Sequence, residues 1–239
     1  MTWLEHLAEL RRRLLICIAA LVITSVVAWF GYNHVITFMV GPYHSYLRHH
    51  PNKNISLGNL VTTGPLEGFT TRIKVTAYIG AVLAAPMILW QLWQFIAPGL
   101  YRRERRYGLS FMCFALILFA MGVATAVVVF PKAINWLISV SGTDVTPLFS
   151  PGSYLGLYAL CCLIFGAVFT YPVILVFLEV VGVLPTLKLR QWRRYAIVVI
   201  CAVAAVITPS NDPFSFLAMA VPMLIFYEIS ILIGRALRR

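Results

Sequence analysis

The sequence has little charge. Asp, Glu, Lys and Arg make up 11% of its 239 residues, and hydrophobic residues make up 61%. A soluble domain carries roughly 25% charged residues. The mean hydropathy of +0.86 agrees with this comparison. The composition excludes an ordinary soluble domain and indicates an integral membrane protein with little mass outside the bilayer.

The sequence also lacks the usual motifs of catalytic and metal sites. It contains no H-E-x-x-H, no G-x-S-x-G and no P-loop pattern. We therefore expect neither an enzyme nor direct use of ATP. The five cysteines have no C-x-x-C spacing, and the histidines have no i, i+4 pairing. We expect no metal site and no cofactor.

Acidic residues are scarce, with 8 Asp and Glu against 19 Lys and Arg. In a membrane protein the resulting charge of +11 reflects orientation and contact with anionic lipid, so we expect no nucleic-acid partner. The basic residues cluster before the first apolar run, between the second and third, between the fourth and fifth, and after the sixth. The positive-inside rule then places both termini in the cytoplasm.

Long apolar runs are plentiful. A helix needs about 20 apolar residues to cross a hydrocarbon core of ~30 Å. The sequence predicts one all-α integral membrane domain over residues 1–239, with six transmembrane helices at about 14–33, 67–97, 107–130, 154–182, 195–207 and 214–234. No small-residue cleavage motif follows the first run, so we expect that run to stay in the mature protein.

The predicted spans are unequal and several contain proline. The fifth span would be roughly 20 Å long, too short for a full bilayer, and a brief turn joins it to the sixth as a short hairpin. Prolines within spans predict kinks and a curved, concave shape, Pro98 should end the second span, and Pro42 falls in a long outer loop with short helices. The prolines assigned structural roles are Pro42, Pro86, Pro98, Pro172 and Pro222.

Two glutamates lie inside runs of arginine. Glu9 has Arg12 and Arg13 three and four residues further along a predicted helix. Glu104 lies among four arginines at the predicted start of the third span, where the helix dipole favours a carboxylate. Each glutamate either neutralises its own neighbours or accepts a cation from another molecule, and spacing alone leaves both readings open.

Both segments are long enough to support a family comparison. They read His6-Leu7-x-Glu9-Leu10-Arg11-x-Arg13-Leu14 and Phe95-Ile96-Ala97-Pro98-x-Leu100-Tyr101-x-x-Glu104-Arg105-Arg106. Together they resemble the two cytoplasmic hallmarks of the TatC family, the six-span core of the twin-arginine protein translocase. Further matches are Ala85-Pro86-x-Ile88-Leu89-x-Gln91-x-Trp93, Val129-Phe130-Pro131, Thr208-Pro209, Ala220-x-Pro222-Met223 and Tyr227-Glu228-Ile229.

The resemblance implies a function in the cytoplasmic (inner) membrane. It implies binding of twin-arginine signal peptides of folded cargo proteins at the cytoplasmic face, and export driven by the protonmotive force. The implied partners are TatA and/or TatB single-span subunits, other TatC copies and membrane lipid. The matched positions assign peptide binding to Glu9, Glu104, Arg11, Phe95 and Leu10. This assignment suits the chemistry, because guanidinium pairs bidentately with carboxylate and lysine cannot reproduce that fork.

Polar groups in or beside the spans are candidates for partner or intramembrane contacts. They are Gln91, Thr170, Thr208, Asp212 and Glu228. A carboxylate inside a span is costly and marks a functional candidate, which applies most to Glu228. The family commonly has Phe-Glu-x-Pro where this chain has Phe169-Thr170-Tyr171-Pro172. Thr170 therefore lacks the charge of that position but can hydrogen-bond across helices.

The alternative function is a small-solute or proton-coupled secondary transporter. Such a protein would show inverted repeats and a midplane site on interrupted helices. The two halves of this chain show no similarity, and Glu228 is the only strongly polar group in the middle of a span. The sequence therefore favours the translocase core over the transporter.

Overall fold

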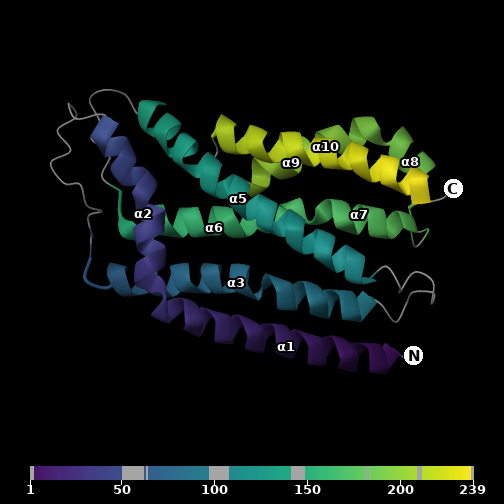
Figure 1. Ribbon diagram of the computed structural model, residues 1–239, viewed down its shortest axis with the longest axis horizontal. Coiled ribbons are helices and arrows are strands. Elements are labelled where there is room, and N and C mark those ends of the chain that lie inside the picture. Colours follow the sequence, from purple (N-terminus) through teal and green to yellow (C-terminus); the bar gives the residue numbers. More distant parts are fainter. Residues whose placement is uncertain are drawn as a thin grey trace.

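The computed structural model describes residues 3–49, 62, 64–96, 108–140, 149–180, 182, 184–208 and 212–237 (Figure 1). Within these ranges every regular element is a helix. The helices are α1 (Trp3–Phe30), α2 (Tyr32–His49), α3 (Glu67–Ile96), α5 (Gly108–Val140), α6 (Pro151–Phe169), α7 (Tyr171–Val180), α8 (Thr186–Gln191), α9 (Arg193–Ile207) and α10 (Pro213–Leu237).

Five stretches of helix are long and apolar enough to cross a membrane: α1, α3, α5, α6 with α7, and α10. The predicted fifth span corresponds to α9, whose 15 residues extend about 22 Å. It packs against α10, and the predicted short hairpin corresponds to this pair. Figure 1 places the start of α1 and the end of α10 at the same end of the molecule. The total of six spans and the cytoplasmic termini stay predictions.

Several bounds differ from those predicted. The predicted third span ends at residue 130, but α5 continues through Pro131 to Val140. Pro131 removes the hydrogen bond to the carbonyl of Val127 and crowds that carbonyl, but burial of Ala133, Ile134 and Ile138 holds the extra turns in place. The region predicted as an outer loop with short helices contains α2, one helix of 18 residues. Tyr154 Oη donates to the carbonyl oxygen of Met39 (3.2 Å) and ties α2 to α6.

The prolines occupy different settings. Pro86 and Pro222 lie inside α3 and α10, which continue past them. Pro172 follows the break between α6 and α7, where the Thr170 N–H bonds to the carbonyls of Ala167 and Val168. Pro42 lies within α2, and the structure describes its backbone alone. Pro98 lies outside the described residues. The predicted kinks and concave shape stay predictions.

Close helix contacts hold the bundle together. The hydroxyl of Thr24 in α1 donates to the carbonyl oxygen of Gly80 in α3 (2.7 Å), and the two helices lie side by side in Figure 1. The rings of Phe130 in α5 and Tyr158 in α6 stack with centroids 4.3 Å apart. Beside this stack, the backbone of Gly122 in α5 touches the backbone of Phe165 in α6.

The Gly122 contact generates a stability prediction. A Cβ at this position would lie 2.7 Å from the carbonyl carbon of Phe165, so Gly122→Ala must push α5 and α6 apart. We expect a loss of about 1–3 kcal/mol, the usual cost of overpacking. Thermal unfolding of the detergent-solubilised protein measures it. Gly156→Ala is the matched control, because a Cβ at Gly156 meets nothing within 4 Å. Equal melting temperatures for the two variants would contradict the prediction.

Candidate functional site

Glu9 lies on α1, one turn before Arg13, and the two form an ion pair. Arg13 Nε donates to Glu9 Oε1 (3.1 Å), and Arg13 Nη2 donates to the same oxygen. The two side chains are only 20% and 18% exposed, so this pair is less screened by water than an ordinary surface pair. Within the described part of the chain, no hydrogen bond reaches Oε2 of Glu9.

The neighbouring helix supplies two amides to the same arginine. Arg13 Nη1 donates to Oε1 of Gln94 (2.7 Å) and lies 3.4 Å from Oε1 of Gln91. Gln91 and Gln94 are three residues apart, so they share a face of α3. Arg13 therefore bridges α1 and α3, with a charged acceptor on its own helix and two neutral acceptors on the other.

A polar cleft of about 450 Å³ lies at this bridge. Water occupies roughly 30 Å³ per molecule in the liquid, so the cleft has ample room for a guanidinium group. Its lining combines one carboxylate, two amides and two arginines with two apolar side chains: Ala8, Glu9, Arg12, Arg13, Ile16, Gln91 and Gln94. A cation that enters the cleft therefore meets Glu9, and an anion meets the arginines.

Among the other predicted peptide-binding residues, Phe95 lies at the contact between α1 and α3. It stacks on His6 of α1, with ring centroids 4.6 Å apart. Leu10 and Arg11 are exposed on α1 and do not line the cleft. The structure thus brings Glu9 and Phe95 to the contact between the two helices, and the roles of Leu10 and Arg11 stay predictions. Glu104 lies outside the described residues, so its distance to Glu9 stays a prediction.

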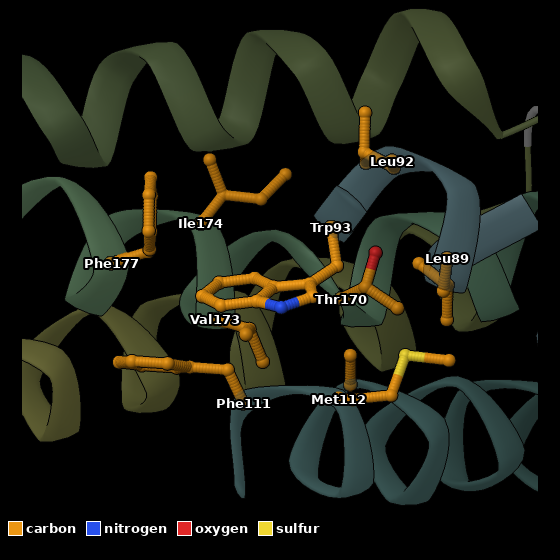
Figure 2. A pocket seen from close by; sticks show the side chains of 10 residues that line it. Leu89, Leu92, Trp93, Phe111, Met112, Thr170, Val173, Ile174 and Phe177 are labelled. Atoms are coloured by element: carbon orange, nitrogen blue, oxygen red, sulfur yellow. The ribbon is translucent and has the colours of Figure 1, made fainter. Parts of the chain in front are cut away.

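A second, apolar cavity of about 100 Å³ lies between the end of α3, the start of α5, and α7. Figure 2 shows the indole of Trp93 in this cavity with Phe111 and Phe177, and the Trp93–Phe177 ring centroids are 5.7 Å apart. The indole also presses against Gly108, where any Cβ would collide with it. Trp93 thereby fixes the end of α3 against the first residue of α5. Residues 97–107, with Glu104, connect these two points.

Three of the predicted candidates for intramembrane contacts form hydrogen bonds with backbone groups close to them in the chain. Thr170 lines the apolar cavity, and its hydroxyl donates to the carbonyl oxygen of Ala167 (2.6 Å) on its own helix. The Thr208 hydroxyl donates to the carbonyl oxygen of Ala204 (2.8 Å). Asp212 Oδ1 accepts from the Ser215 N–H (2.7 Å) at the start of α10. Each of these contacts closes a helix end or turn.

Glu228 is a different case, because its partner is charged. Arg193 Nη2, at the start of α9, donates to Glu228 Oε2 on α10 (2.5 Å). The two side chains are 43% and 48% exposed, so the pair lies at the surface of the chain. The structure therefore places Glu228 at the α9–α10 contact, well separated along the fold from the cleft between α1 and α3.

Sequence reasoning missed one residue of the cleft, Gln94, and one neighbour of Phe95, His6. Gln94 accepts the shortest bond that Arg13 makes to α3, and His6 is the stacking partner of Phe95. The available signal for Gln94 was its spacing of three residues from Gln91. No group of three or more His, Cys, Asp or Glu among the described residues is placed to hold a metal ion.

The helices and the cleft define a multi-pass membrane protein with an acidic acceptor between its first and third helices. A family model described as Sec-independent protein translocase protein (TatC) matches residues 5–222. The chain belongs to the TatC family.

The comparisons with individual proteins agree. The chain is 35% identical to the "Sec-independent protein translocase protein TatC" of Frankia casuarinae, covering 96% of this chain and 64% of that protein. It is 35% identical to the protein of the same name from Carboxydothermus hydrogenoformans, covering 100% of this chain and 94% of that one. A crystal structure of the twin-arginine translocase receptor TatC superposes with a TM-score of 0.78 at 33% identity, covering 98% of this chain and 100% of that one.

The exposure of the Arg193–Glu228 pair predicts a small energetic role. Half-exposed ion pairs contribute about 0.2–1 kcal/mol. A double-mutant cycle with Arg193→Gln and Glu228→Gln should therefore give a coupling free energy in this range, measured by denaturant unfolding in detergent. Raising the salt concentration should reduce it further. A coupling above about 2 kcal/mol would mean that the pair is desolvated in the folded protein.

Proposed function

We propose that this chain is the receptor core of a twin-arginine translocase. It binds consecutive arginines of the signal peptides of folded proteins at the cytoplasmic face of the inner membrane. It also gathers TatA and/or TatB subunits, further TatC copies and lipid into a complex that uses the protonmotive force. Membership of the TatC family supports this function, but the carrying observation is chemical. Glu9 stands in a roomy polar cleft and is already engaged by a guanidinium group.

The geometry at Glu9 supports recognition of arginine in particular. The Nε and Nη2 groups of Arg13 reach Glu9 together, while Nη1 reaches the amide oxygen of Gln94. A planar group with five N–H donors can contact all of these acceptors at once, whereas an ammonium group is a point donor. The contacts of Arg13 in the cleft therefore support the proposal that an incoming arginine makes similar ones.

The surroundings of Glu9 supply the other parts of a peptide site. In the proposed complex, Glu104 binds the second arginine of the pair. Exposed Leu10 and the Phe95 ring contact apolar residues that follow the arginines in the peptide. Arg11 is exposed on α1, and its charge repels peptides whose positive charge is not placed on the two carboxylates.

The exposed apolar face of α9 supports assembly with a single-span partner. Val198 is 68% exposed and Val206 is 85% exposed, whereas Ala204 on the other face is fully buried. Because α9 is too short for a full bilayer, a partner helix beside it would cover a face that thinned lipid covers poorly. We assign this face to TatA or TatB.

Removal of either carboxylate should weaken peptide binding. Hydrogen bonds to charged groups contribute about 1.5–3 kcal/mol, so Glu9→Gln or Glu104→Gln should raise the Kd for a twin-arginine signal peptide at least about tenfold. Fluorescence anisotropy with a labelled peptide and the purified full chain measures this. Glu67→Gln, at the far end of α3, removes the same charge and should leave the Kd unchanged. Normal binding by both site variants would refute the receptor function.

The partner face makes a second prediction. In a chain whose native cysteines are replaced, Val198→Cys or Val206→Cys should form a disulfide with a cysteine placed in the TatA or TatB helix. Ala204→Cys is the matched control and should form none, because its side chain faces the α9–α10 contact. Immunoblotting after mild oxidation of membranes reads out both. Equal crosslinking from the two faces, or none from either, would count against this assignment.

A further inference from the structure

Arg13 of the chain itself is paired with Glu9, the carboxylate that the signal peptide is proposed to bind. We propose that Arg13 is an internal competitor for Glu9, and that an incoming guanidinium group must displace it. This inference rests on the proposed function and concerns how tightly the same site binds. Arg13 then sets the affinity threshold that a peptide has to exceed.

The first step of displacement is open in the structure. Arg13 directs both of its bonds to Oε1 of Glu9. Oε2 receives no hydrogen bond from the described residues, and the carboxylate borders the cleft. An arriving guanidinium can therefore bond to Oε2 while Arg13 still holds Oε1. Each carboxylate oxygen can accept more than one hydrogen bond, so both guanidinium groups can bond to Glu9 in this intermediate before Arg13 leaves.

The second step is also provided for, because Arg13 has other acceptors on α3. Its Nη1 donates to Oε1 of Gln94 at 2.7 Å, and Oε1 of Gln91 lies 3.4 Å away. Once displaced from Glu9, the guanidinium keeps these two amides and stays in the cleft. The Arg13 side chain lines the cleft and is already 18% exposed in the structure, so the displaced charge does not have to enter the apolar interior. The exchange therefore leaves no buried charge without a partner.

The exchange replaces one guanidinium with another, and this sets the affinity that a peptide must reach. For a peptide arginine, the bonds gained at Glu9 match those that Arg13 gives up. A lysine gains a single-point contact and cannot match them. Competition divides the affinity of every peptide by the same factor, as in any site whose competent form is only partly populated. Weak cationic peptides then fall below useful affinity, whereas paired arginines remain above it.

Two substitutions test the competition. Arg13→Lys keeps the charge and the α1 helix but weakens the internal competitor, and Arg13→Gln removes it. We expect Arg13→Lys to lower the Kd of a twin-arginine signal peptide about twofold to threefold, and Arg13→Gln about threefold to tenfold, as release from a partly buried ion pair predicts. A twin-lysine version of the peptide should gain by the same factors.

Arg12→Gln provides the control for long-range charge. Arg12 also borders the cleft but makes no hydrogen bond to Glu9. Its removal should give only the electrostatic gain, which 0.5 M salt largely abolishes. In a Glu9→Gln background, Arg13→Gln should gain no more than Arg12→Gln does. Monodisperse elution and the melting temperature of each variant confirm that it is folded.

The outcomes separate this inference from the proposed function. If Glu9→Gln weakens peptide binding while Arg13→Lys and Arg13→Gln leave it unchanged or weaker, Arg13 is a scaffold and the inference is overturned. The same holds if Arg13→Gln gains no more than Arg12→Gln. If neither Glu9→Gln nor Glu104→Gln has an effect on binding, the proposed function itself fails.

Discussion

The hydrocarbon core of a membrane offers no hydrogen bonds, and this constraint shapes every element of the chain. Backbone groups must find partners within the protein, which only helices or closed barrels allow. The one interruption in the long apolar stretches, at Thr170, obeys the same requirement. Its N–H and hydroxyl both bond to carbonyls of α6, and its own carbonyl accepts from the Val173 N–H. A break at this position therefore exposes few unsatisfied groups.

The cleft depends on where two helices lie relative to each other. Thr24, in the second half of α1, bonds to Gly80 near the middle of α3, and Arg13, in the first half of α1, bonds to Gln94 near the end of α3. These contacts set the distance between the Glu9 carboxylate and the α3 amides. The cleft offers a cation one carboxylate beside two arginines. The side chains that we propose for recognition are therefore the same ones that hold α1 against α3.

Much of this arrangement could be predicted from the sequence, because apolar runs and motif spacing are local signals. The helices, the short α9 and the Glu9–Arg13 spacing all follow from residues close together in the chain. The bridge from Arg13 to Gln94 could not be predicted in this way, because it joins residues 81 positions apart and depends on how α1 and α3 pack against each other. Nor could the continuation of α5 past Pro131, where tertiary burial outweighs a local breaking signal. Local spacing offered Glu9 either an internal or an external partner, and the structure shows the internal one in place.

The contact between Trp93 and Gly108 has a consequence for the cleft. Any side chain at Gly108 would collide with the Trp93 indole, so α5 can begin beside α3 only if its first residue is glycine. The same last turns of α3 hold Gln94, which accepts a hydrogen bond from Arg13. A shift of the indole would therefore move an acceptor of the cleft, and the packing of α5 is coupled to the position of Arg13 through one ring.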